Sequence, residues 1–166
     1  MTASEKAGSD AVWIRPMNAA DLGRILLIAE ELPDAPHWTD SAYSEAIDPD
    51  HRPLRVALVA ADAQAGAQAN AAIGFVVASL VAPEAELETI AVRAGAQRRG
   101  VASQLIARLV EVLRGIQVTE LRLEVRASNL AAIGFYRARG FSEVGRRPRY
   151  YADPEEDAVL MALWLG

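Results

Sequence analysis

The chain has 166 residues, of which 52% are hydrophobic and 23% charged, a composition typical of one soluble globular domain. It contains no cysteine, which excludes disulfides, thiolate metal sites and a cysteine nucleophile. The net charge of −5 is unevenly spread, because residues 93–150 hold 12 arginines and 4 glutamates. This basic segment predicts a polyanionic ligand, with a solvated arginine-rich face as the alternative.

No apolar run approaches the roughly 18 residues that a membrane span needs, and residues 1–10 lack the apolar core of a signal peptide. We therefore expect a disordered tail over 1–10, a single domain over 11–166, no membrane partner and a cytoplasmic protein. The two histidines, His37 and His51, stand among turn-forming residues, so we expect loop positions and no metal site.

The first half of the chain alternates short apolar strands with amphipathic helices. The β-branched run that Pro16 stops predicts a strand, and Asn18 or Asp21 then caps a helix with apolar residues at helical spacing. Thr39 or Asp40 caps a second, short helix. In chain order, we expect strand 11–17, helix 19–32, helix 40–47 and strands 54–61, 72–82 and 85–92, with a flexible hairpin connection over 62–71.

The second half continues this mixed order. Gly115 ends a helix from about Arg99 to Arg114, and the next run alternates apolar and charged residues as a half-buried strand does. A capped helix then stops at Gly140. The remaining elements expected are strand 120–127, helix 128–140 and closing strands 141–147 and 158–165, with residues 148–157 between them. Seven strands and four helices in this order predict an α/β or α+β domain.

The stretch "AVRAGAQRRGVASQLIARLV", residues 91–110, joins a strand to a helix through a glycine-containing turn. The first amides of a helix have no intrahelical acceptor, and with the positive end of the dipole they form an anion site. Gly100 lets a ligand approach the backbone, and Arg98 and Arg99 add donors suited to phosphate. The stretch therefore predicts a pyrophosphate cradle, and a helix start with surface arginines is the alternative. It matches neither G-x-x-x-x-G-K-[ST] nor G-x-G-x-x-G.

Within this stretch, "QRRGVA" (97–102) resembles the Q/R-x-x-G-x-G/A signature of the GCN5-related N-acetyltransferases (GNAT), with Ala102 in place of the more usual second glycine. "LEVRASNLAAIGFYRARGF" and "RYYADPEEDAVLMALWL" resemble the RimI-type ribosomal-protein-alanine N-acetyltransferases. The resemblance covers residues 85–165, and a weaker likeness extends through "HWTDSAY" to the first strand. It implies the GNAT fold, a central mixed, mostly antiparallel seven-stranded sheet flanked by about four helices.

The resemblance implies acetyl-CoA as cosubstrate and no metal. Backbone amides of the turn would hold the pyrophosphate, the preceding strand would pair with the pantetheine arm, and the Val92 amide would donate to the thioester carbonyl. Asn129 would contact the same arm, and a helix N-cap is its alternative role. The cofactor-binding residues implied are Ile90, Ala91, Val92, Arg98, Arg99, Gly100, Val101, Ala102, Ser103 and Asn129.

The resemblance also implies two catalytic residues. Tyr136 matches the tyrosine that donates a proton to the departing thiolate, with core packing as its alternative. Glu124 matches the RimI-type general base, and its alternative is an outward-facing glutamate paired with Arg122 or Arg126. Glu88 is a rival base, on the strand where other branches of the superfamily place theirs. Without cysteine, direct attack of the amine on the thioester is simpler than an acyl-enzyme route.

The acceptor implied is the N-terminal α-amine of a protein, Ala-ended, such as a ribosomal protein. The walls of the peptide channel would be formed by Trp38, Tyr43, Tyr150 and Tyr151, with packing as the alternative role of Trp38. Adjacent tyrosines on a strand face opposite ways, so at most one of Tyr150 and Tyr151 need line the channel. The acidic segments 30–34 and 153–157 would attract a basic protein tail or serve as solubilising surface.

Other functions stay open at this point. A small-molecule amine or a lysine could be the acceptor, and a non-catalytic acyl-CoA-binding module is the alternative of another class. We expect no nucleic-acid partner, because the arginines lack interleaved aromatics, and a monomer or weak dimer.

Overall fold

The computed structural model describes residues 12–32, 38–63 and 72–166, and within them seven strands and four α-helices are present. The tail expected over 1–10, most of the 62–71 connection and His37 lie outside the described residues. In chain order the elements are β1 (Val12–Pro16), α1 (Leu22–Glu30), α2 (Asp40–Ala46), β2 (Arg55–Asp62), β3 (Ala72–Val81), β4 (Glu84–Val92), α3 (Val101–Gly115), β5 (Glu120–Arg126), α4 (Leu130–Arg137), β6 (Ser142–Ala152) and β7 (Glu155–Trp164).

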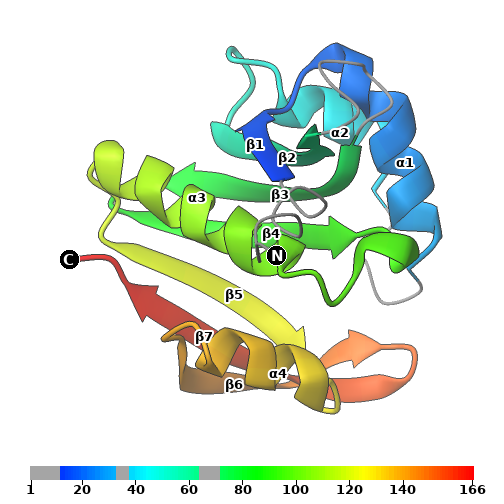
Figure 1. Ribbon diagram of the computed structural model, residues 1–166. Helices are drawn as coiled ribbons and strands as arrows, with labels where there is room; N and C mark the ends of the chain where they lie inside the picture. The colour runs from blue at the N-terminus through cyan, green and yellow to red at the C-terminus, as the bar shows by residue number, and fades with distance from the viewer. Residues whose placement is uncertain (1–11, 33–37, 64–71) are drawn as a thin grey trace, which may run out of the picture. The chain divides into compact units, whose positions relative to one another are not determined.

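The strands form one sheet in the order β1-β2-β3-β4-β5-β7-β6 (Figure 1). β4 and β5 run parallel, whereas β1–β2, β2–β3, β5–β7 and β6–β7 are antiparallel pairs. The predicted fold class, a mixed and mostly antiparallel seven-stranded sheet with four helices, is confirmed. None of the helices in the described ranges is long and apolar enough to cross a membrane.

The chain divides into two compact units. The first unit contains the described residues up to Ser79 together with Glu88–Leu109, and the second contains Leu80–Leu87 and Val110–Gly166. The single domain expected over 11–166 stays a prediction.

Helices α1 and α2 supply the core of the first unit. Ile25 and Ile28 of α1 and Tyr43 of α2 are fully buried against Val59 and Phe75 of the sheet, and each such side chain contributes roughly 1.5–3 kcal/mol by leaving water. Of the two candidates given for each cap, the structure uses Asn18 and Thr39. Asn18 and the following short 3₁₀ helix (Ala19–Asp21) form a capping box, and the Thr39 hydroxyl accepts a hydrogen bond from the amide of Ala42.

In the second unit, β5 alternates as the sequence predicts. Leu121, Leu123 and Val125 are buried, while Arg122 between them is exposed. The first residues of β4 pair with the first residues of β5, so that Glu86 lies beside Arg122. Strand β7 follows β5 on its other side, with Leu160 opposite Glu124. This pairing brings glutamates and arginines of neighbouring strands together around Glu124, on one face of the second unit's sheet.

The closing hairpin differs from the prediction. Strands were expected over 141–147 and 158–165, yet β6 continues to Ala152 and β7 begins at Glu155. The register shifts between Arg147 and Tyr151, and Arg149 adopts a left-handed φ of 52°. The Arg149 amide donates to the Asp157 carboxylate at 3.0 Å, which holds this irregularity. A bulge of this kind accommodates a proline within a strand and lets strand pairing resume after it. A proline in the sequence does not by itself reveal such a bulge.

Candidate active site

The turn before α3, in the first unit, has the backbone that an anion cradle needs. Gln104 donates its amide to the Gly100 carbonyl at 3.1 Å, so the amides of residues 101–103 precede the first α-helical hydrogen bond. Arg98 and Gly100 both have left-handed φ angles, of 64° and 75°. A Cβ atom at Gly100 would meet nothing within 4 Å, so glycine is required here for its conformation and leaves the approach to the backbone open.

A side-chain hydrogen bond ties this turn to the end of β4, and a backbone hydrogen bond ties the residue after β4 to β3. The Gln97 side-chain amide donates to the Val92 carbonyl at 3.0 Å, and the Arg93 amide donates to the Ile73 carbonyl at 2.9 Å. The signature glutamine therefore has a positioning role that the pattern alone did not reveal. Ala91 and Val92 are buried and Ile90 is half-buried, so the strand that would pair with pantetheine is well supported.

Gly74 of β3 also positions this strand and is absent from the sequence-based site. A Cβ atom built on Gly74 would lie 2.9 Å from the Ala91 carbonyl oxygen and 3.2 Å from Val92 Cγ2. Glycine alone permits so close an approach between the backbone of β3 and that of β4. The signal in the sequence was a single glycine inside an apolar strand, which marks close backbone contacts.

The rival base Glu88 is tightly paired in the first unit. Arg55 Nε lies 2.7 Å from Glu88 Oε2, and a second nitrogen of the same guanidinium lies 3.4 Å from Oε1. The Arg55 guanidinium in turn lies 6.0 Å from the centre of the Trp38 ring. Both carboxylate oxygens of Glu88 are thus engaged by one partner.

Tyr43 differs from the channel position expected of it. Its side chain is fully buried, with its ring 5.1 Å from Trp38 and 5.7 Å from Phe75, and burial raises the pKa of its hydroxyl. It supports Trp38, which is half-buried, from the core side. Tyr43 therefore does not lie at the surface of a channel, as was expected. Its position on α2 packs into the core cluster.

Glu124, in the second unit, lies in a cluster of polar groups. Arg147 Nε contacts Glu124 Oε1 at 2.8 Å, and the Glu124 side chain is 17% exposed. The Tyr150 hydroxyl donates a hydrogen bond to Glu124, and this bond to a carboxylate raises the pKa of Tyr150. The ion-pair partners expected for Glu124 are engaged elsewhere, Arg122 with Glu84 and Glu120, and Arg126 with Glu156.

The neighbouring tyrosines do not face opposite ways. The rings of Tyr150 and Tyr151 contact each other with centres 5.1 Å apart, and the guanidinium of Arg126 lies 4.2 Å from the Tyr151 ring centre. The bulge between Arg147 and Tyr151 breaks the strict alternation of β6, so both rings lie on the same side. Sequence reasoning missed Arg147, because its partner Glu124 lies on a different strand, β5.

Tyr136, on α4, is buried in an aromatic cluster. Its ring lies 5.3 Å from that of Phe135 and 5.4 Å from that of Phe141, and its side chain is 8% exposed. Burial raises the pKa of its hydroxyl to about 12, so the hydroxyl keeps its proton at neutral pH, as a proton donor must. Asn129 caps the same helix, since its side chain accepts a hydrogen bond from the Ala132 amide at 3.1 Å, so the role given as its alternative is present.

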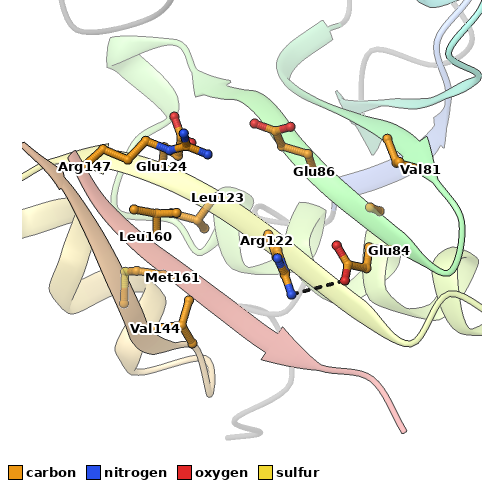
Figure 2. Close-up of a pocket in the computed structure, with 11 residues that line it drawn as sticks. Val81, Glu84, Glu86, Arg122, Leu123, Glu124, Val144, Arg147, Leu160 and Met161 are labelled. Carbon is orange, nitrogen blue, oxygen red and sulfur yellow. Dashed lines mark ion pairs between the residues drawn. The ribbon is translucent and has the colours of Figure 1, made fainter. Parts of the chain in front are cut away.

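A pocket of about 230 Å³ adjoins Glu124 on the sheet of the second unit (Figure 2). Its apolar lining includes Leu123, Val144, Leu160 and Met161, and its polar lining is formed by Glu84, Glu86, Arg122, Glu124 and Arg147. In Figure 2, Glu124 and Arg147 lie together at one end, and the Arg122–Glu84 ion pair lies at the other.

Three comparisons place these features among known proteins. The acetyltransferase (GNAT) family model matches residues 24–141. The [ribosomal protein bS18]-alanine N-acetyltransferase of Salmonella typhimurium is 45% identical over 91 residues, which cover 54% of this chain and 62% of that relative. The chain thus matches less than two thirds of that curated relative's length.

Solved structures match over more of the chain. The ribosomal-protein-S18-alanine N-acetyltransferase from Escherichia coli has 29% identity and a TM-score of 0.77, with 94% of this chain and 95% of that chain covered. Arabidopsis thaliana NAA60 in complex with acetyl-CoA has 22% identity and a TM-score of 0.80, covering 93% and 98%, and this likeness concerns the fold.

Proposed function

The chain belongs to the GNAT acetyltransferase family, and from this premise we propose that it transfers acetyl from acetyl-CoA to the N-terminal α-amine of a protein. The family predicted from residues 97–102 is thereby confirmed. The observation that carries the proposal is the turn between β4 and α3. This turn contains two residues with left-handed φ angles and leads directly into the first amides of the helix.

The residues present fit acetyl-CoA, which supplies the acetyl group as a thioester. We assign the pyrophosphate to the amides of residues 98–103, where Gly100 leaves the backbone accessible. The pantetheine arm pairs with Ile90, Ala91 and Val92, and the Val92 amide donates to the thioester oxygen as negative charge develops there. Asn129 contributes to the same arm besides its capping role.

In the proposed reaction the amine nitrogen bonds to the thioester carbon, the carbon–sulfur bond breaks, and one proton leaves the amine while another reaches the thiolate. Glu124 takes the first proton and Tyr136, still protonated at neutral pH, gives the second. An α-amine with a pKa near 8 loses its proton at a cost of about 1 kcal/mol at pH 7, whereas a lysine with a pKa near 10.4 loses its proton at a cost of about 5 kcal/mol. A single glutamate is therefore a suitable base for the α-amine.

Glu124 is favoured over Glu88 by its contacts. Arg55 engages both carboxylate oxygens of Glu88, whereas Glu124 contacts the exposed Arg147 through a single oxygen and accepts a hydrogen bond from the Tyr150 hydroxyl. A base needs an oxygen that can turn to the acceptor amine, and Glu124 meets this need with less rearrangement.

The acceptor follows from the relatives, whose names refer to an alanine of ribosomal protein bS18 or S18. We propose an Ala-ended protein, such as a ribosomal protein, as the acceptor of this chain. Tyr150 and Tyr151 beside Glu124 would contact the first residues of that acceptor.

The test measures CoA release from acetyl-CoA together with mass spectrometry of two competing peptides. One has a free N-terminal alanine and no lysine, and the other is N-blocked with an internal lysine. We expect acetylation of the first alone, with kcat falling about 10²- to 10⁴-fold in Tyr136→Phe and in Glu124→Gln. Glu143→Gln, which removes another arginine-paired glutamate, serves as the matched control and keeps full activity.

Two results would contradict the proposal. Acetylation of the lysine peptide alone would make lysine the acceptor. Tight acetyl-CoA binding with neither peptide acetylated would indicate a small-molecule acceptor or a non-catalytic acyl-CoA-binding module.

A further inference from the structure

A buried hydroxyl on β4 lacks a hydrogen-bond partner. Thr89 lies in the first unit and is 4% exposed, and its Oγ1 atom meets no donor or acceptor among the residues that the structure describes. Its neighbour in the chain, Glu88, is held through both carboxylate oxygens by Arg55. Burying a hydroxyl without a partner is unfavourable, and most buried polar groups in proteins are paired. A valine would have a similar shape without this penalty, so the hydroxyl at this position needs a physical reason.

The position of Thr89 on β4 suggests that reason. Thr89 directly precedes Ile90, the first of the three residues to which we assign the pantetheine arm. Successive residues of a strand are about 3.3 Å apart, so Thr89 stands one step from Ile90 and about 10 Å from Val92 along the strand. Thr89, these three residues and the pyrophosphate turn all belong to the first unit. The Thr89 hydroxyl is therefore within reach of the part of the arm that lies along Ile90.

The chemistry of a hydroxyl suits this arm. The pantetheine arm carries two amide groups, and their polar atoms need new partners when the arm leaves water. A threonine hydroxyl offers one donor and two acceptor positions. Among residues 87–92, Glu88 and Thr89 alone have polar side chains. Because Glu88 is engaged by Arg55, Thr89 is the side chain of this segment that remains for the arm.

We propose that the Thr89 hydroxyl donates a hydrogen bond to an amide carbonyl of the pantetheine arm when acetyl-CoA binds. The bond gives the buried hydroxyl its partner, so binding removes a penalty that the free protein carries. Thr89 acts through its side chain, whereas Ile90, Ala91 and Val92 offer backbone groups. The inference rests on the proposed function, because that function assigns the arm to those three residues.

The experiment measures binding and stability, which do not depend on an acceptor. Isothermal titration calorimetry gives Kd for acetyl-CoA, for CoA and for ADP, which carries a pyrophosphate without the arm. Differential scanning calorimetry gives Tm without ligand and with acetyl-CoA. The variants are Thr89→Val, which removes the hydroxyl and keeps the shape, and Thr89→Ser, which keeps the hydroxyl. The matched control is Tyr43→Phe, which also removes a buried hydroxyl without a partner among the described residues.

We expect Thr89→Val to raise Kd about fivefold for acetyl-CoA and for CoA alike, and to leave Kd for ADP unchanged. Its Tm without ligand should stay unchanged or rise, because valine buries no unpaired hydroxyl. The increase in Tm that acetyl-CoA produces should become smaller, since this increase follows the affinity. Thr89→Ser should bind all three ligands within about twofold of the unsubstituted chain, and Tyr43→Phe should leave the three Kd values unchanged.

Three results would overturn the proposal. Thr89→Val could bind acetyl-CoA as the unsubstituted chain does, it could weaken ADP to the same extent as CoA, or Thr89→Ser could lose as much affinity as Thr89→Val. A fall in Tm without ligand together with equal weakening of all three ligands would give the hydroxyl a structural role instead. If the expected Kd pattern holds while neither test peptide is acetylated, the assignment of Thr89 stands and the proposed transfer to a protein amine fails alone.

Discussion

Gly74→Ala tests the close approach of β3 to the proposed pantetheine strand. The added Cβ would lie 2.9 Å from the Ala91 carbonyl oxygen, 3.2 Å from Val92 Cγ2 and 3.4 Å from Leu105 Cδ1. The first contact is with backbone, so it is relieved only if a strand moves. Overpacking of this kind costs about 1–3 kcal/mol, which for a chain of this size lowers Tm by roughly 2–10 °C.

The displaced strand carries Ala91 and Val92, so we also expect the KM for acetyl-CoA to rise several-fold. Differential scanning calorimetry gives Tm, and CoA release at varied acetyl-CoA gives KM. Gly23→Ala in α1 is the matched control, because its Cβ would meet nothing within 4 Å. Alanine is better than glycine in a helix by about 1 kcal/mol, so this control should raise Tm.

The reasoning fails if Gly74→Ala behaves as Gly23→Ala does. An unchanged or raised Tm together with an unchanged KM would mean that the backbone of β3 does not approach Ala91 as closely as the structure shows.

Three further predictions concern backbone conformation and buried polar groups. Gly100→Ala places a side chain at a φ of 75° without a steric contact, so it should cost about 1–2 kcal/mol in urea unfolding and weaken acetyl-CoA binding in isothermal titration calorimetry. Tyr43→Phe removes a buried hydroxyl that has no hydrogen-bond partner among the described residues, so the urea midpoint should stay unchanged or rise. Asp21 is fully buried; burial raises its pKa, but hydrogen bonds from Arg15 and the Asn18 amide and the Arg15 charge outweigh this and leave the pKa below the ordinary 3.8. Its contribution to stability is therefore present above about pH 4 and lost as pH falls through the lowered pKa, so thermal unfolding from pH 7 to pH 2 should show a steeper acid loss in the native chain than in Asp21→Asn.

Much of the fold follows from local patterns. The candidate caps included the three residues that the structure uses, Asn18, Thr39 and Asn129, because a cap bonds to an amide two or three residues away. The alternation of β5 was visible for a similar reason, since one face of the strand is buried and the other is half-buried or exposed. The turn before α3 was recognisable because its glycine and its helix start are neighbours in the chain.

Local patterns did not predict the full length of the hairpin formed by β6 and β7. Pro148 and Pro154 lie in the segment 148–157 that was expected to separate two strands, and whether a strand continues past a proline depends on what lies beside it. In the structure a bulge at Arg149, held by Asp157 of the partner strand, lets β6 continue to Ala152.

The sequence by itself thus determined the order of the elements, their caps and the family signature, because each of these depends on residues close together in the chain. Tertiary structure decided which arginine meets Glu124, which one engages Glu88, and why β3 needs glycine at residue 74. These contacts join different strands, and a shift of one residue in register would exchange the partners on each face. The residue types of the candidate site can therefore be recognised from short sequence motifs, whereas the contacts between those residues depend on the tertiary structure.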